Sequence, residues 1–225
     1  MSIQRPLSIR VAGILALVLL SFAWAQTRVN GVVGACAAVA PADVVAESRS
    51  GLSWFPFEVG RGTVGADGAF ALQFHDTLPL SAEVAAPIGQ LFDAIGCVGL
   101  TISDTAARVI VVRDLRVIPR GAACEYCETL GALYAATQPR GRLSATGDLE
   151  VQWIYADRDV TVDGVCGHGW GDESYALCLE AGWNTVVLET TAVRPSEGYC
   201  DCHDVAATVA AFPRADVAWH FAPTR

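Results

Sequence analysis

Eight cysteines are the side chains of this 225-residue sequence with the clearest chemical potential, since thiols form disulfides, bind metal ions or act in redox reactions. They are Cys36, Cys97, Cys124, Cys127, Cys166, Cys178, Cys200 and Cys202. An even number of cysteines in an exported chain is typical of a disulfide framework. We therefore expect structural disulfides, and we pair Cys36 with Cys97 because no other cysteine lies before residue 120.

The other cysteines leave several pairings open. Cys200 and Cys202 would share one face of a strand, and a bond between them would be strained, so each needs a separate partner. Cys124 and Cys127 can pair with each other in a turn, or each can reach one of the later two. The sequence does not decide between these arrangements.

A zinc site is the alternative chemistry for this cysteine-rich segment. The candidate ligands are Cys124, Cys127, Cys200, Cys202 and His203, with His168 as a further one. Tetrahedral zinc bound by four cysteines, or by three cysteines and one histidine, suits such a set. A redox role is not favoured, because neither cysteine of the CxxC pair has a basic neighbour in sequence that would stabilise a thiolate.

Other polar clusters have a simpler interpretation than catalysis or calcium binding. His75-Asp76 and His203-Asp204 each place a base beside an acid, but no G-x-S-x-G or H-E-x-x-H motif accompanies them. The carboxylates between residues 157 and 173 match no EF-hand spacing, so we expect Asp157-Arg158-Asp159 to be a locally paired loop. We thus expect no catalytic residues, no cofactor and no enzyme activity.

The first 25 residues have the layout of a cleaved secretory signal peptide. Arg5 and Arg10 precede an apolar run over residues 11–23, and Ala23-Trp24-Ala25 is a small-x-small cleavage site. The alternatives are an uncleaved anchor, for which the run is short, and lipidation of Cys36 after a lipobox-like segment that does not follow the run directly. We expect a secreted or extracytoplasmic protein, in the periplasm or at the cell surface, whose only membrane segment is this leader.

The net charge and one aromatic residue in a predicted exposed loop indicate which classes of partner to expect. The chain has 15 arginines, no lysine and 24 acidic residues, a net charge of −9, which becomes −11 (13 against 24) once the leader is removed. This balance argues against nucleic acids and anionic membranes. Trp170 lies among three glycines in a predicted exposed loop and is a candidate binding surface. We therefore expect an envelope or extracellular protein, or a glycan, as partner.

Short apolar runs separated by turn residues predict an all-β fold. Asp67-Gly68 between two such runs predicts a hairpin, and Pro56 suggests that residues 54–59 form an edge strand. One short helix is predicted over residues 87–95, because four apolar residues at i, i+3, i+4 and i+7 share a helical face. Residues 129–137 favour a strand over a helix.

The segment Pro119-Arg120-Gly121 predicts a turn that interrupts the run of strands. We place a boundary there between two β-sandwich-like halves, residues 27–120 and the cysteine-rich residues 121–225, both following the signal peptide of residues 1–25.

Two segments of the first half, residues 29–33 and 67–72, carry the patterns G-x-V and D-G-x-F-x-L. Through these two patterns, residues 27–120 resemble transthyretin-like or carboxypeptidase-regulatory-like β-sandwich modules. The resemblance implies that this half serves as a rigid folding, spacing or adhesion unit. Through residues 155–164 and 179–184, the whole mature chain also resembles a group of uncharacterised bacterial secreted β-rich proteins. That second resemblance implies fold and export only.

Together these observations predict a secreted or envelope-associated, non-enzymatic structural or binding module that disulfides stabilise. Zinc binding through the cysteine-rich segment is the first alternative function, and a hydrolase built on His75 or His203 is the second.

Overall fold

The computed structural model describes residues 28–33, 41–48, 56–82, 84–121, 129–140, 144–168, 171–194, 202–210 and 216–224. Within them the predicted all-β class is confirmed, since fifteen strands share one hydrogen-bonded network and one short helix packs against it. The elements are β1 (Arg28–Val32), β2 (Ala42–Ser48), β3 (Phe57–Val64), β4 (Ala69–Phe74), β5 (Ala86–Pro87), α1 (Ile88–Ala94), β6 (Thr101–Ile102), β7 (Arg108–Val112), β8 (Leu115–Pro119), β9 (Gly131–Ala136), β10 (Leu149–Ala156), β11 (Val160–His168), β12 (Gly171–Leu179), β13 (Gly182–Arg194), β14 (Cys202–Val209) and β15 (Ala218–Pro223).

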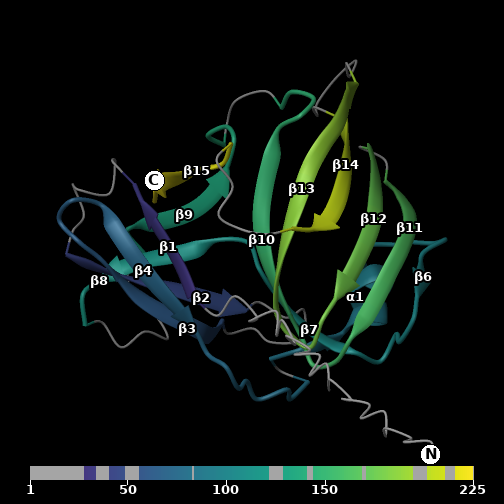
Figure 1. Ribbon diagram of the computed structural model, residues 1–225, viewed down its shortest axis with the longest axis horizontal. Helices are drawn as coiled ribbons and strands as arrows, with labels where there is room; N and C mark the ends of the chain where they lie inside the picture. The colour runs from purple at the N-terminus through teal and green to yellow at the C-terminus, as the bar shows by residue number, and fades with distance from the viewer. Residues whose placement is uncertain are drawn as a thin grey trace, which may run out of the picture.

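The strands form two groups in space (Figure 1). One group holds β1 to β4 with β8, β9 and β15, and the other is the curved sheet of β10 to β14, with α1, β6 and β7 beside it. The path through both groups runs β1-β4-β3-β2-β8-β9-β10-β13-β14-β12-β11-β6. The β9–β10 pairing therefore joins the two groups.

Strands from both sides of residue 120 pair with each other. β8 pairs with β9, β7 with β10, and β6 with β11. The division into residues 27–120 and 121–225 stays a prediction, and a boundary at that place would separate three pairs of hydrogen-bonded strands.

Two hydrophobic cores lie on opposite faces of β10 and β13. On β10, Trp153 belongs to the larger core, whereas the next residue, Ile154, belongs to a second core beside α1. On β13, Val187 and Val186 divide between the two cores in the same way. Because successive side chains of a strand point to opposite faces, a strand that is buried on both sides reads as a continuous apolar run.

Three local predictions are confirmed. The Asp67-Gly68 turn joins β3 and β4, and Gly68 has φ 78°, a conformation that favours glycine. The predicted helix is α1, which follows Pro87 and ends before Gly96 at φ 75°. The segment 129–137 contains a strand, β9.

The edge-strand prediction from Pro56 was wrong. β3 pairs with β2 on one side and with β4 on the other, so it is an inner strand. Pro56 lies just before the strand begins at Phe57, where its missing N–H leaves the ladder intact.

A disulfide joins Cys97, in the loop after α1, to Cys166 on β11, with their Cα atoms 5.0 Å apart. The expected Cys36–Cys97 pair is therefore wrong. The pairing of Ile102 with Val162 brings the loop after α1 alongside β11, although the two segments are far apart in sequence. Cys36 lies outside the described residues. A disulfide fits a chain that folds in an oxidising compartment.

α1 spans seven residues, and in the described part of the chain no helix has the length and apolar character needed to cross a bilayer.

Removing the Cys97–Cys166 bond should lower the free energy of unfolding. Cys166→Ser loses a crosslink between residues 69 positions apart, and we expect a loss of about 2–4 kcal/mol, measured by equilibrium unfolding in urea. Cys178→Ser is the matched control, since Cys178 is exposed and unbonded, and its effect should stay within about 0.5 kcal/mol. A Cys166→Ser protein as stable as the parent would contradict this role of the bond.

Candidate functional site

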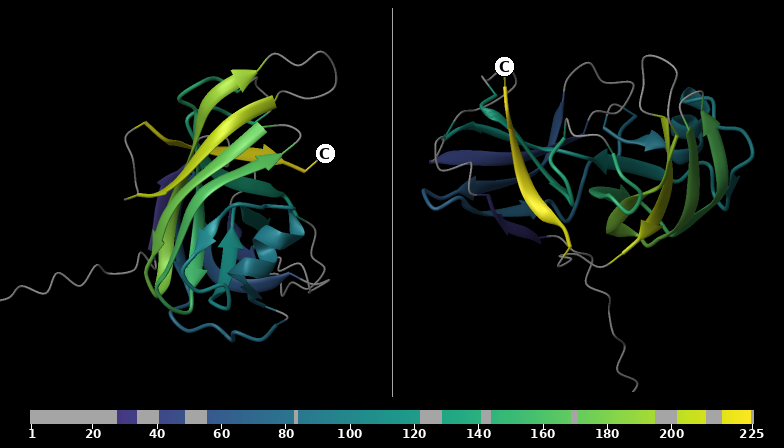
Figure 2. Two further views of the ribbon diagram at one scale, coloured as in Figure 1. Left: turned by 90° about the vertical axis from the view of Figure 1, so that its right-hand side faces the viewer. Right: turned by 90° about the horizontal axis from the view of Figure 1, so that it is seen from above.

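A cavity of about 710 Å³ among the described residues lies between α1 and one face of the sheet. We call it the helix groove. Figure 2 shows α1 against the face of the curved strands. Its apolar end is lined by Ile88, Leu91, Phe92, Val109, Ile154 and Leu177. The groove thus extends the second core to the surface, because α1 covers its face of the sheet only in part.

Strand alternation decides which side chains face the helix groove. On β7 these are Val109, Val111 and, just after the strand, Arg113. On β10 they are Gln152 and Ile154, two residues apart. Since positions i and i+2 share a face, each strand contributes apolar side chains near α1 and a polar one further away.

A second cavity of about 300 Å³ adjoins the first, and we call it the polar cleft. Arg113, Gln152 and Tyr175 line both cavities. The polar cleft is further lined by charged and polar side chains that include Arg140, Asp148, Glu150, Glu173, Thr190 and His203. The combined site is therefore amphipathic, apolar under α1 and polar at its other end.

Most charges around the site are compensated. Arg140 forms ion pairs with Asp114 at 2.7 Å and with Glu150 at 2.5 Å, and its guanidinium lies 4.4 Å from the centre of the Tyr134 ring. Burial alone would lower the pKa of Arg140, but the hydrogen bonds that it donates to these two carboxylates raise the pKa above its usual value. Arg140 therefore carries its charge at every accessible pH and is already saturated with anions.

Two polar side chains at the junction of the cavities have no such partner. Gln152 is 8% exposed, and its amide oxygen has no hydrogen-bond partner among the described residues. Arg113 is exposed and makes no ion pair within the described part of the chain. A buried amide without a partner costs free energy, so such a group in a cavity wall points to a ligand.

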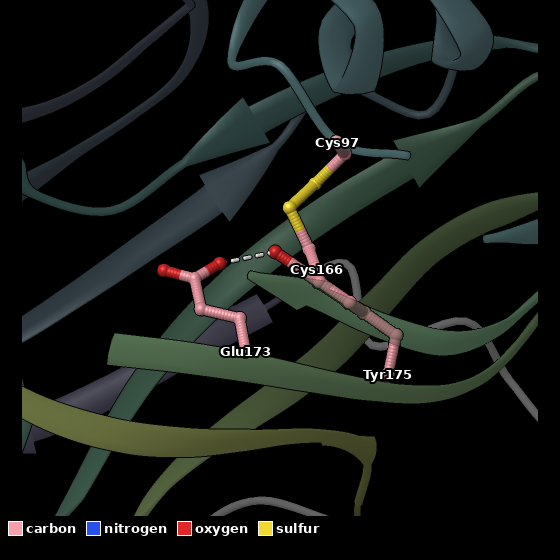
Figure 3. Close-up of a disulfide and its surroundings, with 4 residues drawn as sticks. All are labelled: Cys97, Cys166, Glu173 and Tyr175. Carbon is pink, nitrogen blue, oxygen red and sulfur yellow. Dashed lines mark hydrogen bonds between the residues drawn. A yellow bond between two sulfur atoms is a disulfide. The ribbon is translucent and has the colours of Figure 1, made fainter. Parts of the chain in front are cut away.

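Tyr175 lines both cavities at the junction, and Figure 3 shows it beside Glu173 and the disulfide. Its hydroxyl donates a hydrogen bond to Glu173, and its ring meets Phe92 of α1 edge-on at 5.0 Å. Burial and this hydrogen bond raise the pKa of Tyr175, so it remains a neutral donor. Glu173 lies opposite Cys166 in the β11–β12 ladder, so the disulfide anchors this wall of the site.

Few of the residues singled out from sequence lie in the site. His203 is half-buried and lines the polar cleft. Cys166 lies beside Glu173, its partner in the β11–β12 ladder. Cys178 is exposed, and it alternates along β12 with Leu177, which faces the groove. His75 is exposed in the loop after β4.

The loop Asp157-Arg158-Asp159 contains the local ion pairing that the sequence predicts. Asp157 pairs with Arg158 at 2.9 Å, and Arg158 also reaches Asp104 at 3.3 Å. Burial would raise the pKa of Asp157, but hydrogen bonds from Arg158 and from the N–H of Arg108 lower it. This loop is a local ion-pair cluster.

The remaining predicted positions lie outside the described residues. They are Cys36, Cys124, Cys127, Cys200 and Trp170, together with the side chains of His168 and Cys202. Among the residues that are described, no cluster of potential metal ligands occurs. The zinc alternative and the Trp170 surface stay predictions.

Sequence reasoning missed Arg113 and Gln152. A weak signal exists in each case, because Gln152 interrupts the otherwise apolar run of β10 and Arg113 follows the apolar β7 directly. What the sequence does not show is that the two strands are neighbours, since β7 and β10 are separated by β8 and β9 in the chain.

Comparisons of the chain with protein-family models, with curated proteins and with solved structures found no match. Both resemblances described above stay predictions, and the site is interpreted from its own geometry.

Replacing the unpartnered amide should stabilise the protein. Gln152→Leu keeps the approximate volume and removes a buried polar group without a partner, so we expect the free energy of unfolding to rise by about 1 kcal/mol. Unfolding in urea measures the difference. Gln73→Leu on β4 is the control, because Gln73 is exposed and should change stability by less than about 0.5 kcal/mol. A loss of stability in Gln152→Leu would show that the amide has a structural role.

Proposed function

We propose that this protein is an exported, non-enzymatic binding module that takes an elongated amphipathic small molecule into the helix groove. The observation that carries the proposal is the adjoining of an apolar cavity and a polar one, with Gln152 unpartnered at their junction. An apolar ligand segment would lie under α1, and a polar head would meet the junction.

The dimensions support a small ligand. A volume of about 710 Å³ lies within the range of roughly 300–1,000 Å³ that is typical of small-molecule sites. Such sites combine a mostly apolar lining with a few convergent polar groups, which is the composition of the helix groove.

Two further features support export and a binding role. The Cys97–Cys166 bond and the acidic surface suit an extracytoplasmic, soluble protein. The disulfide holds the loop after α1 against β11, so the wall formed by the helix is fixed before any ligand arrives. A preformed wall reduces the entropy cost of binding. A protein or glycan partner at Trp170 is a separate prediction.

Binding should depend on the length of the apolar segment. For alkyl carboxylates from octanoate to dodecanoate, each additional buried methylene contributes about 0.8 kcal/mol, so we expect the affinity to rise about fourfold per methylene until the groove is filled. Isothermal titration calorimetry measures this series. An affinity independent of chain length would contradict burial in the groove.

The matched variants are Leu91→Glu and Val98→Glu. Leu91 faces the groove from α1, and a charge there should abolish binding of all chain lengths, whereas Val98 is 83% exposed outside the lining and its variant should bind as the parent does. Circular dichroism confirms that both variants fold. Equal binding by both would contradict the assignment of the groove.

A further inference from the structure

We infer that the ligand is an aliphatic monocarboxylate whose head is bound by Arg113 and Gln152. The inference rests on the proposed function and specifies the chemistry of the head. It follows from three properties of the junction: the positive charge of Arg113, the partners that the surrounding carboxylates already have, and the register of β7 and β10.

Arg113 supplies a positive charge at the junction that no ion pair with another described residue compensates. It lines both cavities. The other arginines lining them are occupied: Arg116 pairs with Glu47 at 2.6 Å, and Arg140 pairs with two carboxylates. Guanidinium groups bind carboxylates through two parallel hydrogen bonds. Arg113 is thus the group that an anionic head would meet.

The carboxylates of the site do not select a cation, because each already has a partner. Glu47 pairs with Arg116, Asp114 and Glu150 pair with Arg140, and Glu173 accepts the Tyr175 hydroxyl. Asp148 accepts hydrogen bonds from Thr137 and from the N–H of Ala145. Oδ1 of Asp114 makes no hydrogen bond but lies 2.7 Å from Arg140. An ammonium head would therefore compete with Arg116 and Arg140 for these carboxylates, whereas an anionic head displaces no partner of Arg113 among the described residues.

The strand register places Gln152 next to Arg113. In the antiparallel β7–β10 ladder Ile154 pairs with Val111 and Trp153 with Val112. The ladder ends at this pair. Gln152 and Arg113 are the next residues along the two strands and therefore lie opposite each other. Opposite side chains on one face lie about 5 Å apart at Cβ. The guanidinium and the amide therefore converge on one position.

The amide completes the recognition of a carboxylate. A carboxamide carries both donors and acceptors, and by turning about its last torsion Gln152 presents its NH₂ group to an oxygen that Arg113 also binds. The aliphatic chain then continues over Val111 and Ile154 toward Leu91 of α1. One ligand would thus pair with Arg113, accept a hydrogen bond from the NH₂ group of Gln152 and fill the apolar end.

The test compares heads of different charge on one chain length: dodecanoate, dodecanol and dodecylammonium, titrated calorimetrically into the oxidised mature protein. We expect dodecanoate to bind at least about tenfold more tightly than either of the others. In Arg113→Gln the affinity for dodecanoate should fall by about tenfold to a hundredfold, as for a lost charge-assisted hydrogen bond, while dodecanol changes less than about threefold.

Two further variants sharpen the result. Arg120→Gln removes an exposed arginine outside both cavities and should leave all three affinities unchanged. Arg113→Lys keeps the charge and should retain the preference for dodecanoate at reduced affinity. This variant keeps the inference testable if Arg113→Gln does not fold.

The outcomes separate the two proposals. Equal binding of alcohol and carboxylate, tighter binding of the ammonium, or an unchanged preference in Arg113→Gln would overturn the inference and leave the groove as a binding site. Binding of none of the three probes would overturn both the inference and the proposed function.

Discussion

Burial of β10 and β13 on both faces is the constraint on which the rest of the structure depends. Because side chains alternate along a strand, these two strands serve two cores at once, with Trp153 on one side and Ile154 on the other. The first core is closed by the strands of the other group, which complete a layered packing. The second core is covered by one short helix, with Leu100 and Ile102 packing beside it, so its cover is incomplete. The helix groove is the consequence of covering a wide sheet face with seven helical residues.

So short a helix has little stability of its own, since nucleation is costly and a helix of this length has few internal hydrogen bonds to offset it. α1 holds its place through Ile88, which is buried, and through the contact of Phe92 with Tyr175. The Cys97–Cys166 bond then fixes the chain directly after the helix to β11. The same strand pairs with β12 opposite Glu173. One crosslink therefore positions both the helical wall and the polar wall of the site.

The elements that follow from local chemistry were predictable. The Asp67-Gly68 hairpin, the helix after Pro87 and the all-β class each depend on turn residues or periodicity within about ten positions. What failed depends on long-range pairing. The expected pairing of Cys36 with Cys97 rests on their being the two cysteines before residue 120, yet the pairing of β6 with β11 brings the loop after α1 to Cys166. The sequence does not predict the junction for the same reason. Arg113 and Gln152 become neighbours only when β7 pairs with β10, and β8 and β9 separate these two strands in the chain.

The overall charge constrains how such a site can work. With a net charge of −9, the long-range field of the protein repels anions, and electrostatic steering opposes the ligand that Arg113 favours. At physiological ionic strength this field decays over about 8 Å, so an anion close to the junction is governed by the nearest groups. Those are the guanidinium of Arg113 and the amide of Gln152, whose oxygen has no partner among the described residues. The surrounding carboxylates interact with Arg116, Arg140 and Tyr175. Affinity must then come from short-range pairing and from burial of the aliphatic chain, and this is why the cation and the apolar groove have to adjoin.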